Sequence, residues 1–164
     1  MASTCPECSA SLGDSGSCRD HFHEMLALDA QAQLPFAAGT MTHFLAVASY
    51  NLQHPSAFVP AALFGLRRTV ADVLAGRSTL DDARRRARAA ADGPTRVLRR
   101  PEEQPSDADQ AVLRAWPNEW SMTVLDVCRV PPEQYETRVR AWAAAVIDAL
   151  RDVPIDTPSQ ERTV

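Results

Sequence analysis

Apolar residues recur along this chain at the three- and four-residue spacing of α-helices, whereas the alternation typical of β-strands is weak. The clearest pattern lies near the C-terminus, in a helix expected to open at Pro132. Its stripe advances in steps of 4, 3, 4 and 4 through Tyr135, Val139, Trp142, Val146 and Leu150. We expect Tyr135 and Trp142 to lie in the core. The pattern predicts an all-α fold.

A first helix is expected to begin near Cys18. Ser17 can cap its N-terminus, and Asp20, three residues on, completes a variant of the capping box. Pro35 and Gly39 are expected to end this helix. Its apolar residues share one face: Phe22, Met25 and Leu26.

The next three helices are expected over residues 41–54, 60–75 and 79–91. Thr40 and Thr79 stand at N-cap positions, and Asp82 completes a capping box with Thr79. Pro55 ends the first of these helices, and Gly76 lies just past the end of the second. All three helices therefore have recognisable boundaries.

Residues 93–109 contain three prolines and several charges and are expected to form a surface loop. A short helix should follow near Thr123. We predict one domain of five to six helices, orthogonal or bundle-like, over residues 18–152. Residues 1–17 are expected to form a small metal-binding knuckle, and residues 153–164 a disordered tail.

Composition narrows the function classes. The 164 residues carry a formal net charge of −4, which gives no overall attraction to nucleic acid or anionic lipid. No membrane span and no secretory signal is visible, so we expect a cytoplasmic protein without a membrane partner. All 17 basic residues are arginine, a bias typical of GC-rich bacterial genomes.

Three cysteines lie close together near the N-terminus. Cys5 and Cys8 form a C-x2-C turn, and Cys18 follows ten residues later. Such a turn brings two thiolates within reach of one tetrahedral ion, and disulfides are rare in the cytosol. We therefore expect zinc as the cofactor, ahead of a redox dithiol. Cys128 lies on an apolar face and is expected to pack in the core.

The candidates for the fourth ligand are histidines. His21 would complete a local knuckle, three residues after Cys18. His43 and His54 are eleven residues apart, roughly 16 Å on a continuous helix, so they cannot share an ion. The first two helices should be antiparallel neighbours, which brings His54 to the same end as Cys18 and leaves His43 at the far end. We predict Cys5, Cys8, Cys18 and His54 as ligands, with His21 as the alternative to His54.

Several motifs together resemble those of one bacterial family. The chain has CPEC, then Cys18 with Phe22, and then the pattern H-x6-Y-x2-QHP from His43 to Pro55. Further matching positions follow at Trp120, Asp126, Tyr135 and Trp142-Ala143. This combination is similar to domain-of-unknown-function family 5946, over about residues 5–150. The resemblance implies a histidine at position 54 rather than 21, and it implies no established activity.

Three functions remain open. The first is a non-enzymatic helical protein with structural zinc, acting as an interaction or regulatory module with a protein partner. The second is a metal-dependent enzyme with its site near His43, Tyr50 and His54, close to Glu24 or Asp29. The third is a nucleic-acid-associated protein using the stretch Arg84–Arg100. Acidic residues bracket that stretch and no aromatic residue interrupts it, so we expect a solvated face and no nucleic-acid partner.

Overall fold

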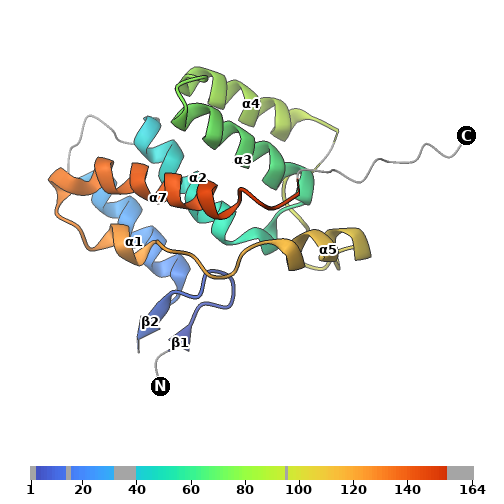
Figure 1. The fold of residues 1–164 in the computed structure, drawn as a ribbon, viewed down its shortest axis with the longest axis horizontal. Coiled ribbons are helices and arrows are strands. Elements are labelled where there is room, and N and C mark those ends of the chain that lie inside the picture. The colour runs from blue at the N-terminus through green and yellow to red at the C-terminus, as the bar shows by residue number, and fades with distance from the viewer. Residues whose placement is uncertain (1–2, 14–15, 32–39, 95, 155–164) are drawn as a thin grey trace, which may run out of the picture.

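The computed structural model describes residues 3–13, 16–31, 40–94 and 96–154. The predicted end of the first helix at Pro35 and Gly39 lies outside these residues, as does the predicted tail beyond residue 154. Within the described ranges, the predicted all-α fold is confirmed (Figure 1). None of the described helices is both long and apolar enough to span a membrane.

Seven α-helices and one small antiparallel hairpin make up the described part of the chain. The hairpin pairs β1 (Ser3–Thr4) with β2 (Ser11–Gly13). The helices are α1 (Cys18–Gln31), α2 (Met41–Gln53), α3 (Pro60–Leu74), α4 (Leu80–Asp92), α5 (Asp107–Ala115), α6 (Leu125–Cys128) and α7 (Tyr135–Ala149). Short 3-10 turns precede α3 and α7 at η1 (Pro55–Ala57) and η2 (Pro132–Gln134).

Helix α5 was not predicted, because it begins inside the segment expected to be a loop. Ser106 caps it, with its hydroxyl accepting a hydrogen bond from the Asp109 N–H at 3.1 Å. No residue of α5 is fully buried. Val112 and Leu113 nevertheless pack partly buried against the core, and Ser106 with Asp109 has the spacing of an N-cap, so the sequence did carry a signal for this helix.

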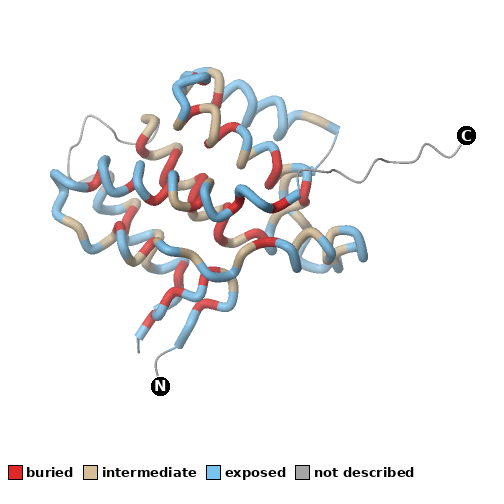
Figure 2. Tube along the Cα trace, in the orientation of Figure 1, coloured by how far each residue is buried: buried red, intermediate tan, exposed pale blue. Residues whose placement is uncertain are grey.

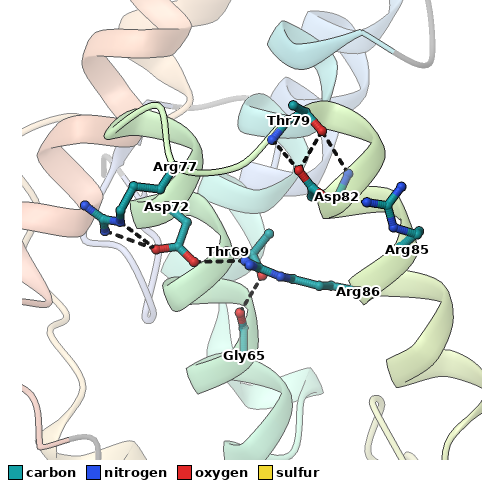
Figure 3. A network of polar contacts seen from close by, with 8 residues as sticks. All are labelled: Gly65, Thr69, Asp72, Arg77, Thr79, Asp82, Arg85 and Arg86. Carbon is teal, nitrogen blue, oxygen red and sulfur yellow. Dashed lines mark hydrogen bonds and ion pairs between the residues drawn. The ribbon is translucent and has the colours of Figure 1, made fainter.

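The predicted side-chain caps of α1, α2 and α4 are confirmed. The Ser17 hydroxyl accepts from the Asp20 N–H at 3.2 Å. The Thr40 hydroxyl accepts from the His43 N–H at 3.3 Å. Thr79 and Asp82 form a reciprocal capping box, in which each side chain accepts a hydrogen bond from the other residue's N–H (Figure 3). Gly76 follows α3 with φ of +71°, a left-handed conformation that glycine adopts without steric cost. These local interactions explain why the boundaries could be located from the sequence.

Helix α2 lies at the centre of the domain and packs against both α3 and α7. Buried positions gather on α2 and on the sides of its neighbours that face it, whereas α4 is almost entirely exposed (Figure 2). Trp142 on α7 is fully buried, as predicted, and Tyr135 is nearly so. The core therefore forms around α2 and α7.

The buried end of α2 is polar. Gln53 is fully buried, and its amide nitrogen donates to the carbonyl of Met122 at 2.7 Å. Its amide oxygen accepts from the indole N–H of Trp142 at 3.1 Å. A second indole, that of Trp116, donates to the carbonyl of Leu52 at 2.7 Å. These hydrogen bonds satisfy groups that would otherwise be costly to bury, and they fix the last turn of α2.

We expect Trp142→Ala to lower the free energy of unfolding by about 3–5 kcal/mol, because it opens a cavity and removes the hydrogen bond to Gln53. Trp142→Phe fills most of the space but leaves the Gln53 amide oxygen without its donor, and should cost about 1–3 kcal/mol. Urea denaturation of the two variants and the parent measures both values. A change in melting temperature below about 1 °C for Trp142→Ala would contradict a core position.

Candidate metal centre

The N-terminal hairpin brings Cys5 and Cys8 together. Between its strands the chain turns tightly: the Cys5 N–H donates to the Ala10 carbonyl and the Ser9 N–H donates to the Cys5 carbonyl, both at 3.0 Å. Ser9 has φ of +55°, a left-handed conformation that is uncommon for a residue other than glycine. The segment expected to be a metal-binding knuckle is therefore a hairpin whose turn carries two thiols.

The ligand atoms of Cys5, Cys8, Cys18 and His54 all lie within 4.8 Å of one another. Cys5 Sγ is 3.6 Å from His54 Nε2, and Cys8 Sγ is 3.3 Å from Cys18 Sγ. Bonds of about 2.3 Å to sulfur and 2.0–2.1 Å to nitrogen in a tetrahedron give ligand separations of roughly 3.5–3.8 Å. The three cysteines are buried. This Cys3His group could hold a metal ion.

The antiparallel arrangement of α1 and α2 explains the position of His54. Cys18 is the first residue of α1, and His54 directly follows the last residue of α2. Both ends lie beside the hairpin (Figure 1). The structure therefore brings the four predicted residues together.

The imidazole of His54 is oriented by its surroundings. Its Nδ1 lies 2.7 Å from the carbonyl oxygen of Tyr50, to which Nδ1–H donates. Nε2 then faces the cysteines as the free nitrogen, an orientation typical of metal-ligating histidines. The ring stacks on Tyr50 at 4.1 Å between centroids, and Tyr50 stacks on Phe22 at the same distance. Hydrogen bonding and stacking together restrict the rotation of the ring.

The four groups also share protons. A hydrogen bond from the Cys18 thiol lowers the pKa of Cys8 to about 4, against the opposing effect of burial. The same hydrogen bond raises the pKa of Cys18 far above its usual range. Burial lowers the pKa of His54, but hydrogen bonds with Cys8 and with the Tyr50 carbonyl outweigh it and raise that pKa to about 9. Without a metal, the group thus favours a Cys8 thiolate beside a protonated His54. A bound metal ion would displace the protons on Cys18 and on Nε2 of His54.

The remaining histidines lie outside the cluster. His21 Nδ1 is 3.1 Å from a carboxylate oxygen of Glu24, with which it forms a partly buried pair. His43 is half-buried in the first turn of the continuous helix α2, at the end opposite His54. The side chain of Asp29 lies outside the described residues. Among those described, the structure gives His21 and His43 no part in the Cys3His group.

Cys128 does not join the group either. It is half-buried and packs against the core from the end of α6, with its thiol 3.8 Å from the Leu125 carbonyl. Burial raises the pKa of this thiol. Its surroundings agree with the packing role expected from the sequence.

Two contacts that the sequence did not indicate fasten the hairpin to the helical domain. The carboxylate of Glu7 accepts a hydrogen bond from the Ser56 N–H at 3.0 Å. The hydroxyl of Ser9 donates to the Asn118 carbonyl at 2.7 Å. Glu7 lies between Cys5 and Cys8, and Ser56 lies two residues after His54. The first contact thus joins the two segments that supply ligands, and no spacing rule predicts it.

We expect Glu7→Ala to loosen this junction and to speed hydrogen exchange at the Ser56 amide about tenfold, since the amide loses its acceptor. Glu102→Ala is the matched control, because it removes the same side chain at an exposed position in a segment remote from the hairpin in sequence. Exchange measured by NMR tests the contact. Equal Ser56 exchange in both variants would show that Glu7 does not restrain this segment.

Comparison with known proteins gives a family and no activity. No curated protein and no solved structure matches the chain. The model of the family of unknown function DUF5946 matches residues 3–151, a range that contains all four residues of the Cys3His group and every described helix. The resemblance seen in the sequence is thus confirmed, and the chain belongs to the DUF5946 family.

Proposed function

We propose that the chain binds one zinc ion through Cys5, Cys8, Cys18 and His54, and that the ion is structural. The observation that carries this proposal is the buried convergence of three thiols and one correctly oriented imidazole. Thiolate and imidazole ligands in tetrahedral sets suit zinc, whereas magnesium and calcium prefer oxygen. The donor set therefore supports zinc over those ions.

Four protein ligands complete a tetrahedron and leave no position for a reacting water. Catalytic zinc sites characteristically have three protein ligands and one open position. In the metal-dependent enzyme considered above, His43 and Tyr50 would have to lie beside the ion. The structure has His43 at the other end of α2, whereas Tyr50 does lie beside the group, with its ring stacked on His54 and its carbonyl bonded to His54 Nδ1. This arrangement favours a non-enzymatic protein.

The ion would cross-link three segments: the hairpin turn, the start of α1 and the end of α2. The two strands of the hairpin are too short to be stable alone, so metal binding should contribute to the local folding of the N-terminus. A helical domain stabilised in this way offers a rigid surface. We propose that the protein acts as an interaction or regulatory module with a protein partner.

The ligand assignment is tested by metal content. We expect one zinc per chain in the parent protein, and less than about a fifth of that in His54→Ala, because three thiolates alone form a weaker and more open site. His21→Ala should retain the metal, since His21 pairs with Glu24 instead. Elemental analysis after gel filtration in a reducing buffer measures the ratio.

Two results of the metal analysis would contradict this ligand assignment. Full zinc in His54→Ala together with loss in His21→Ala would make the site a local knuckle and contradict the long-range ligand. A reduced parent protein that contains no zinc and takes none up would contradict the proposal as a whole and favour a redox role for the cysteines.

The arginine-rich stretch supports no nucleic-acid function. Five of its seven guanidinium groups form ion pairs with carboxylates: Arg84–Asp81, Arg85–Asp82, Arg86–Asp72, Arg96–Glu103 and Arg99–Asp109. Arg99 has its side chain only 8% exposed, which removes it from any phosphate contact. The paired carboxylates oppose the approach of a polyanion.

We therefore expect no submicromolar binding to DNA, whether duplex or single-stranded. Fluorescence anisotropy with labelled 20-nucleotide probes at 50 and 200 mM salt measures this. Tight binding that weakens steeply with salt would overturn the expectation, because that dependence reports phosphate contacts.

A further inference from the structure

A groove of about 860 Å³ runs between α3 and α7, away from the Cys3His group. The two helices are antiparallel: Arg140 near the middle of α7 donates to the Leu74 carbonyl at the end of α3, and Arg67 donates to the Val153 carbonyl beyond α7. On α3 the lining extends from Ala61 to Leu74, roughly 20 Å at the rise of an α-helix. Ala61 and Ala144 are exposed, so the groove is open to solvent rather than enclosed.

Gly65 lies in the middle of this groove, inside a helix where glycine is a poor choice. A Cβ atom added there would meet no atom within 4 Å. Its φ is not positive, so the backbone does not require glycine either. Nothing in the described residues therefore explains why position 65 is glycine. The close approach of another molecule to this helix would explain it.

Small and aliphatic side chains surround Gly65 in the lining. Ala61, Ala71 and Ala144 are small, and Leu74 and Ile147 are half-buried at the sides. Small residues let a third helix approach to the 8–10 Å separation of packed helices. The groove has the length of about four helical turns and suits an amphipathic helix.

The charged residues that line the groove indicate which sign of charge the partner should carry. Four arginines and two aspartates line the groove, a balance of +2 on a chain whose formal net charge is −4. Asp72 is already held by Arg77 and by Arg86 of α4 (Figure 3), and Asp148 by Arg151. Arg67 donates to the carbonyls of Val153 and Arg151, so among the described residues Arg68 is the lining arginine without a hydrogen-bond or ion-pair partner. The groove is complementary to an acidic ligand.

We propose that the α3–α7 groove docks an acidic amphipathic helix of a protein partner, with its small or aliphatic face over Gly65 and a carboxylate at Arg68. This inference rests on the proposed interaction module and names the partner's chemistry. Gly65 would contribute to this binding by leaving space for the partner helix, and Arg68 by its charge. The two contributions can therefore be tested separately.

The probe is a displayed library of 16-residue helical peptides with small and aliphatic residues on one face and Glu, Gln or Lys varied on the other. Selection against the parent protein should enrich glutamate. Gly65→Leu should weaken the selected peptides at least tenfold, with the melting temperature unchanged or raised, because the side chain enters open space. Arg68→Glu should weaken them at least tenfold as well.

Matched controls lie outside the groove. Ala89→Leu places the same leucine side chain on exposed α4, and Arg138→Glu reverses an exposed charge on α7 that does not line the groove. Both should leave binding unchanged. The proposal would be overturned if the selection enriched lysine, if it gave no binder, or if Gly65→Leu bound the peptides as well as the parent. It would also be overturned if NMR mapping placed the peptide contacts outside α3 and α7.

Zinc content is measured on every sample, so that the two proposals fail separately. A zinc-loaded parent that selects no acidic peptide would overturn the groove and leave the metal site standing. A metal-free parent that binds acidic peptides over Gly65 would support the groove and contradict the structural zinc.

Discussion

Two adjacent side chains at the end of α2 face in different directions, and the rest of the structure depends on this junction. Gln53 is buried, with its amide bonded to Trp142 of α7 and to the backbone at Met122. His54 turns out of the helix toward the cysteines. A buried amide that lost its partners would be costly, so α2 cannot rotate or shift along its axis without breaking these bonds. The core thereby fixes where the imidazole lies.

Features with a short-range physical cause could be predicted from the sequence. Capping side chains located α2 and α4, a proline at the start and a glycine after the end located α3, and an apolar stripe located α7. His54 was preferred to His43 and His21 from the helical rise and from the antiparallel packing of two neighbouring helices. Those arguments use only local geometry and a short connection, and the Cys3His group agrees with them.

Features that arise from packing between distant segments could not be predicted. The Glu7–Ser56 hydrogen bond joins residues 49 apart, and the Phe22–Tyr50 stack joins α1 to α2. Neither leaves a periodic signal. Helix α5 was missed because its cap lies at the end of a segment with three prolines and several charges, although Ser106 and Asp109 have the spacing of an N-cap. The two short strands fall below the length at which alternation can be recognised.

The separation of the ligands along the chain has a thermodynamic consequence. Thirty-six residues separate Cys18 from His54, whereas three separate Cys18 from His21. The entropy lost on closing a loop grows as (3/2)RT ln n, so assembling the site from the unfolded chain costs about 2 kcal/mol more across the longer interval. Because the unfolded chain does not hold such a site together, ligation by His54 would couple metal binding to the folding of α1 and α2 as well as to the ordering of the hairpin. Removing the metal with a chelator would then lower the stability of the whole domain. The unfolding midpoint would depend on the concentration of free metal.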